Sequence, residues 1–127
     1  MGRLFAMIAK WIDIDGGKWR IVVNYDVTPD ESIWITKQLR SVNARESDIE
    51  AAVTMFDEPN RACTVSDPDE RMSVVCIGWT TSSTEWHNSI VHEIDHVQRD
   101  ICEYYDVSLG GETAAYLQGY LAGEMIL

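Results

Sequence analysis

The residues best able to carry chemistry lie at positions 92–96, which read His-Glu-Ile-Asp-His. The segment around them is predicted to be a helix from its apolar period. Side chains four residues apart on a helix share one face, about 6 Å apart at their origins, so His92 and His96 can reach a single zinc ion. Glu93 is rotated by about 100° from His92 and can hold a water beside the metal without replacing it as a ligand. This spacing predicts a zinc site with an adjacent general base.

The remaining residues of this helix place the two histidines on its polar face. The apolar side chains gather on the opposite side and are expected to pack against the core: Ile90, Ile94, Val97, Ile101 and Tyr104. The histidine face is expected to point toward a groove, together with Ser89, Arg99, Asp100 and Glu103. Packing alone does not require two histidines there, which favours a functional role.

A catalytic zinc ion usually has three protein ligands, so a third is expected from elsewhere in the chain. Glu112 is the best candidate, 16 residues after His96. The chain has room to end the helix, turn at Gly110-Gly111 and bring a carboxylate back at the start of the next helix. Tyr116 and Tyr120 follow on that helix and are candidates for a place behind the ligands, although a tyrosine one turn from a ligand more often packs.

The elements that must position these residues predict an α+β fold in a single domain, 1–127. Residues 1–83 are expected to form a small, mostly antiparallel sheet and two short helices, and residues 84–127 a metal-binding pair of antiparallel helices. The predicted strands cover residues 5–14 and 18–27 around the turn at 15–17, then 62–65 and 72–77 around the turn at 67–69. The predicted helices run from Pro29 to about Val42, from Ser47 to about Phe56, from Thr84 to about Tyr105, and from about Gly111 to the C-terminus.

Composition and charge argue against a nucleic-acid partner and a membrane partner. The formal net charge is −11, from 21 acidic and 10 basic residues, and no Lys/Arg cluster stands out, so a nucleic-acid partner is not expected. The apolar run at residues 4–9 is too short for a secretory signal or a membrane span, which predicts no membrane partner and a cytoplasmic location. The three cysteines have irregular spacing and are expected to be free thiols.

The pattern His92-Glu93-x-x-His96, followed by Glu112 in a downstream helix, resembles the gluzincin branch of the zincin metallopeptidases. The resemblance covers residues 84–123, and the run Glu-Thr-Ala-Ala-Tyr-Leu-x-Gly from residue 112 is similar to short zincin-like proteins of bacteria and phages. It implies a minimal zincin-like fold and a metallopeptidase with zinc as cofactor, which would cleave a peptide or protein substrate in the cytoplasm, or in the host cytoplasm if a phage encodes it. Zinc would lower the pKa of a water, and Glu93 would take the proton as general base. An edge strand would hold the substrate, and residues 72–77, directly before the helix, are expected to be that strand.

Two other interpretations stay open. The chain could be a catalytically silent interaction or structural protein, encoded by a phage or mobile element, in which zinc joins two helices. Substitution of Glu93 separates this interpretation from an enzyme, because only an enzyme loses a function while keeping its metal. A third possibility is a metal-dependent hydrolase acting on something other than a peptide. The sequence contains no signal for the oligomeric state, which stays unknown.

Overall fold

A β-hairpin opens the part of the chain that the computed structural model describes, residues 7–127. It joins β1 (Ile8–Ile14) and β2 (Trp19–Val27) in antiparallel register. The turn between them places Asp15, Gly16 and Gly17 at positive φ, which glycine adopts at little cost and aspartate tolerates. The hairpin predicted at residues 15–17 is therefore confirmed, and the first two residues of the predicted strand 5–14 lie outside the described residues.

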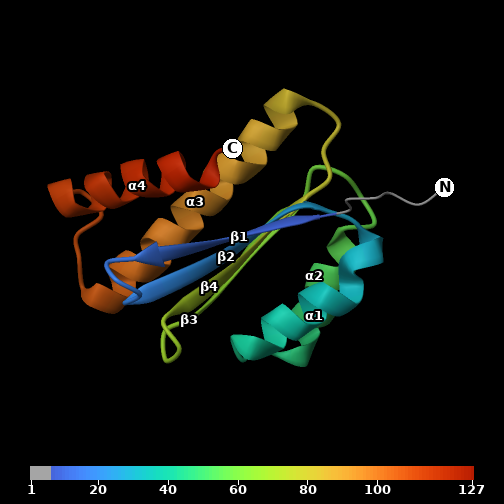
Figure 1. The fold of residues 1–127 in the computed structure, drawn as a ribbon, viewed down its shortest axis with the longest axis horizontal. Coiled ribbons are helices and arrows are strands. Elements are labelled where there is room, and N and C mark those ends of the chain that lie inside the picture. Colours follow the sequence, from blue (N-terminus) through green and yellow to red (C-terminus); the bar gives the residue numbers. More distant parts are fainter. Residues whose placement is uncertain (1–6) are drawn as a thin grey trace.

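The hairpin belongs to a four-stranded mixed sheet within residues 7–127, in the order β1-β2-β4-β3 (Figure 1). β3 (Ala62–Asp67) and β4 (Met72–Gly78) pair antiparallel, whereas β2 and β4 pair parallel. The parallel pair arises because the chain leaves β2, passes through two helices and β3, and only then returns beside β2; parallel neighbours need such a crossover. The sheet was expected to be mostly antiparallel, and two of its three pairings are.

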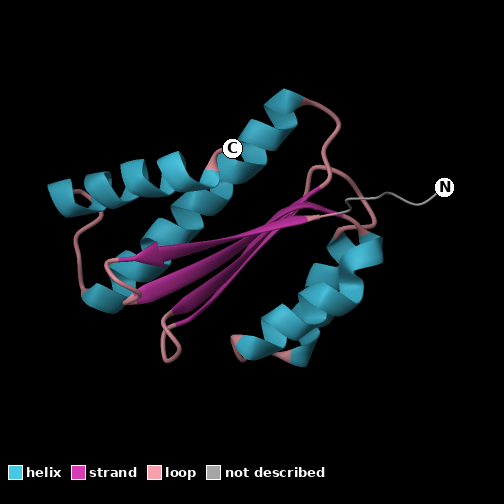
Figure 2. Ribbon diagram, in the orientation of Figure 1, coloured by secondary structure: helices cyan, strands magenta, loops and turns pink. Residues whose placement is uncertain are grey.

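Helices cover both faces of this sheet, so the described chain has three layers (Figure 2). A short 3-10 helix (Pro29–Glu31), α1 (Ser32–Ser41) and α2 (Glu46–Met55) cover one face, and α3 (Ser83–Tyr105) and α4 (Glu112–Met125) cover the other. The α+β class and the positions of the predicted helices are thus confirmed. Because both faces are covered, Val22 and Asn24 of β2 are as buried as Ile21 and Val23.

α3 is the long helix that carries the motif. Its N-terminal cap is Ser82, whose hydroxyl accepts a hydrogen bond from the Glu85 backbone N–H at 3.1 Å, whereas the helix was predicted to begin at Thr84. Its C-terminus is closed by Asp106 in the left-handed conformation, with Val107 N donating to Cys102 O at 2.8 Å. α4 then turns back and crosses α3 obliquely (Figure 1). None of the helices in residues 7–127 is both long and apolar enough to cross a bilayer.

Candidate metal centre

The two motif histidines lie together on the exposed side of α3. The Nε2 atoms of His92 and His96 are 3.1 Å apart, and their ring centroids are 4.8 Å apart. Two imidazole nitrogens bound to a tetrahedral zinc ion at about 2.0–2.1 Å lie roughly 3.3 Å from each other. The pair is therefore spaced as two ligands of one ion would be, with little movement needed. Without metal, the same distance is a hydrogen bond in which one neutral ring donates to the other.

Glu93 points from α3 toward the sheet and is buried, with 2% of its surface exposed. Thr64 of β3 donates its hydroxyl proton to Glu93 Oε1 at 2.9 Å. Burial raises the pKa of the Glu93 carboxyl above its ordinary value, and the Thr64 hydroxyl together with His96 and His92 partly opposes this rise. The carboxylate thus has the environment of a proton acceptor working nearer neutral pH than an exposed glutamate does.

Glu93 and His92 line the same small hollow. Its volume is about 210 Å³, and His92, Glu93 and Ser89 of α3 face the start of β3 across it, at Arg61 and Ala62. No described residue donates a hydrogen bond to Glu93 Oε2, and every fully buried side-chain oxygen or nitrogen of residues 7–127 has a partner, so Oε2 is not fully buried. Glu93 itself lines this hollow. A water can therefore reach the carboxylate beside His92.

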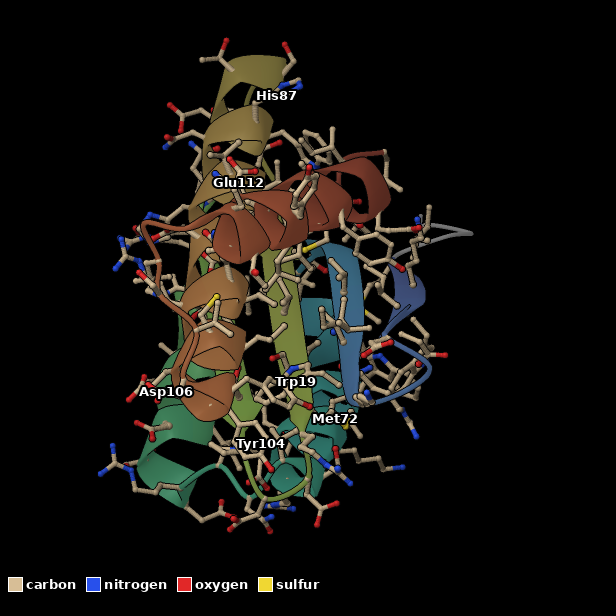
Figure 3. All side chains as sticks on the ribbon, turned by 90° about the vertical axis from the view of Figure 1, so that its left-hand side faces the viewer. Trp19, Met72, His87, Tyr104, Asp106 and Glu112 are labelled. Carbon is tan, nitrogen blue, oxygen red and sulfur yellow. The ribbon has the colours of Figure 1, made fainter. Side chains whose placement is uncertain are left out.

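The structure does not bring Glu112 to the histidines. Glu112 is exposed at the first turn of α4, the end of that helix nearest to the viewer in Figure 3. The start of α4 is held by Gln98, whose Nε2 donates to Ala114 O at 2.8 Å. Gln98 is two positions after His96, which is about 200° around the helix, so α4 meets the other flank of α3. Within residues 7–127 no three His, Cys, Asp or Glu side chains come close enough together to hold a metal, and the three-ligand site stays a prediction.

Within the described residues, neither tyrosine of α4 makes a hydrogen bond or ring contact with a residue of the motif. Tyr120 donates its hydroxyl proton to the backbone oxygen of Asp13 in β1, at 3.0 Å, and so ties α4 to the hairpin. Tyr116 is 76% exposed. A place for either tyrosine behind the metal ligands stays a prediction, and the contact made by Tyr120 is structural.

The strand expected to hold the substrate, residues 72–77, is the wrong one. This segment is β4, which pairs with β2 on one side and β3 on the other and has no open edge. The edge strand beside α3 is β3. Along it runs a hollow of about 590 Å³ between α2 and α3, here called the β3 groove, lined by Asp48, Ala51, Ala52, Met55, Cys63, Thr64, Val65, Ser66, Pro68, Asp100, Glu103 and Tyr104.

Sequence reasoning missed the part that β3 plays in the site. Thr64 and Ser66 are the polar members of an alternating strand, and both contact carboxylates of α3: Glu93 and Asp100. Their alternation with Cys63 and Val65 was the available signal, since it marks a strand with one polar and one apolar face. Which helix that polar face meets depends on the order of the strands in the sheet. The local sequence of β3 does not determine that order.

Comparisons of this chain with protein-family models, with curated proteins and with solved structures find no match.

Proposed function

We propose that this chain is a zinc-dependent hydrolase with a minimal zincin-like fold, and that it cleaves a peptide bond in an extended peptide or protein segment. His92 and His96 are the proposed metal ligands, and Glu93 is the proposed general base. The observation that supports this most directly is the 3.1 Å separation of the two Nε2 atoms, next to the buried carboxylate of Glu93, which lines a hollow together with His92.

A bound zinc ion supplies Lewis acidity, polarising a carbonyl and lowering the pKa of a water. His92 and His96 bind it only as neutral imidazoles, so protons and metal compete for the pair at acid pH. Glu93 accepts the proton of the attacking water at Oε2 and delivers it to the leaving nitrogen. Thr64 keeps Oε1 occupied, which fixes the orientation of the carboxylate and leaves Oε2 as the reactive oxygen.

Glu112 is the proposed third ligand. Because it does not lie beside the histidines, the proposal requires the start of α4 to move. The first turn of α4 must shift around α3, and the hydrogen bond from Gln98 Nε2 to Ala114 O must break. Gly110 and Gly111 precede α4, and neither would meet a backbone or side-chain atom closer than 3.6 Å on gaining a Cβ. The linker therefore has both the backbone freedom and the space for such a movement.

The first test is metal content, measured by elemental mass spectrometry on the untagged full chain after zinc loading and desalting. We expect about one zinc per chain, lost in His92→Ala and His96→Ala and reduced in Glu112→Ala. His87→Ala is the matched control, because His87 is an exposed histidine of the same helix, and its one hydrogen bond within residues 7–127 is to Ser83 O, at 2.8 Å. Equal zinc in wild type and His96→Ala would contradict the proposed site.

The second test is hydrolysis of a peptide library, followed by mass spectrometry. Glu93→Gln should keep its zinc and lose at least 10²-fold in kcat, since it can no longer accept a proton. A wild-type chain that binds zinc and cleaves no member of the library would contradict the enzymatic part of the proposal and leave the metal site.

A second candidate is a catalytically silent protein of this fold, for which zinc would be structural. It is favoured by the hydrogen bond between Thr64 and Glu93, which a purely structural carboxylate would also make. In that case Glu93→Gln changes stability alone, and His96→Ala lowers the unfolding temperature of the zinc-loaded chain without any loss of a reaction.

A further inference from the structure

The outer edge of β3 presents unpaired backbone groups to the β3 groove. Gly78 N donates to Arg61 O at 2.8 Å, which makes Arg61 and Gly78 a hydrogen-bonded pair of the antiparallel ladder. Hydrogen-bonded pairs alternate along such a ladder, so the odd-numbered residues of β3 bond to β4. Ala62, Thr64 and Ser66 then direct their N–H and C=O groups outward, and no strand in residues 7–127 pairs with them. An extended peptide can add to this edge by main-chain hydrogen bonds.

The groove beside this edge carries negative charge and no basic lining residue. Its ionisable carboxyl groups are those of Asp48, Asp100 and Glu103. Arg45 offsets Asp48 through an ion pair of 2.9 Å, but neither Asp100 nor Glu103 has a basic partner within residues 7–127. Both of these carboxylates come from the part of α3 that follows His96, so the negative charge lies beyond the proposed reaction centre.

A chain of hydrogen bonds through the sheet fixes the Asp100 carboxylate. Trp19 Nε1 can only donate, and it donates to Ser73 Oγ at 3.0 Å. Ser66 Oγ gives its proton to Asp100 Oδ2 at 2.6 Å, so Ser73 must donate to Ser66 across their 2.7 Å contact. The donors therefore run in one direction from β2 through β4 and β3 to α3, and the last of them ends on the Asp100 carboxyl group. Charge-assisted bonds of this kind hold a carboxylate in place before any ligand arrives.

We propose that the β3 groove selects an extended substrate segment with a lysine or arginine side chain, which lies between Asp100 and Glu103 while its backbone pairs with β3. This inference rests on the proposed function, because it names the substrate class of that site. Thr64 contacts Glu93, and Ser66 contacts Asp100. The position on β3 beside the general base and the position beside the Asp100 carboxylate are therefore two residues apart. Two strand residues span about 7 Å and return to the same face. The basic side chain is thus two residues from the bond that is cleaved.

The experiment measures peptide binding by fluorescence anisotropy on the full-length Glu93→Gln chain, loaded with zinc and also metal-free. The probe is a labelled ten-residue peptide of alternating threonine and valine with one central lysine, compared with the same peptide carrying norleucine or glutamate there. We expect the lysine peptide to bind roughly three- to tenfold more tightly than the norleucine peptide, and the advantage to shrink as salt is raised. N-methylation of alternate peptide nitrogens should weaken binding at least threefold if the backbone pairs with β3.

Matched variants assign the effect to the groove. Glu103→Gln should remove most of the preference for lysine, whereas Asp13→Asn, the same loss of charge on β1 at the opposite edge of the sheet, should leave it unchanged. Equal binding of the three peptides, equal effects of the two variants, or a dimer formed through β3 that excludes the peptide would each overturn the inference.

The outcomes separate this inference from the proposed function. Hydrolysis without any preference for a basic residue overturns the inference and leaves the hydrolase. A lysine preference that depends on Glu103, in a chain that neither binds zinc nor cleaves peptides, supports the groove and removes the hydrolase.

Discussion

Replacement of Thr64 by valine probes the contact between the edge strand and the motif helix. Because burial raises the pKa of Glu93, the folded metal-free chain keeps this proton at pH values where the unfolded chain has released it. The native state then binds more protons than the unfolded state, so stability falls as pH rises from the ordinary carboxyl pKa through the folded one. Ionised Glu93 therefore costs stability at neutral pH, and the Thr64 hydroxyl offsets part of that cost.

The expected magnitude follows from the charge of the acceptor. A hydrogen bond to a charged group contributes about 1.5–3 kcal/mol, and one between neutral groups about 0.5–1.5 kcal/mol. Thr64→Val should accordingly lower the free energy of unfolding by about 1.5–3 kcal/mol at pH 7 and by roughly 1 kcal/mol less at pH 4.5. That difference corresponds to a further rise of the Glu93 pKa in the valine variant, because the Thr64 hydroxyl no longer stabilises the ionised carboxylate.

Urea denaturation of the chelator-treated chain at pH 4.5, 5.5 and 7 measures these free energies. Thr64→Ser is the control that keeps the hydroxyl, and Glu93→Gln completes a double-mutant cycle in which the charged acceptor is absent. If Thr64→Val costs the same at pH 4.5 and pH 7, or the same with Gln at position 93, the hydroxyl does not stabilise an ionised Glu93 and the assignment of the general base loses its support.

Three further predictions concern the packing that positions the site. Gly78→Ala should cost about 1–3 kcal/mol in urea denaturation, because its Cβ would lie 2.7 Å from Arg61 O and 2.8 Å from a Phe56 ring carbon; full stability would refute this close approach. Leu121→Ala should lower the free energy of unfolding by about 2–5 kcal/mol, since this side chain of α4 is wholly buried in the core. If α4 packed loosely on the sheet, the change would be nearly neutral. Tyr25 should titrate with a pKa of about 12, raised by burial, so stability falls from pH 10 to 12; absorbance at 295 nm, with Tyr25→Phe as reference, tests this.

Local features of the sequence determined most of the elements. The aspartate and two glycines at 15–17 supply the positive φ values of the hairpin, and the apolar period of residues 84–105 determines both the length of α3 and the face that packs on the sheet. The pairing of His92 with His96 also follows from sequence, because a helix places residues four apart on one side whatever surrounds it. These inferences need only near neighbours along the chain, and the structure agrees with them except at Tyr104, which was expected on the packing face and is 45% exposed.

The tertiary structure alone decided what surrounds the histidines. Residues 62–65 and 72–77 were both predicted to be strands, but the parallel pairing of β4 with β2 placed β4 inside the sheet and left β3 at the edge beside α3. Glu93 is buried because Thr64 arrives from that edge, and Glu112 is remote because α4 meets the Gln98 flank of α3. Each outcome depends on contacts between residues far apart in sequence, which form according to the packing of whole layers, so no local pattern of polar and apolar residues determines them.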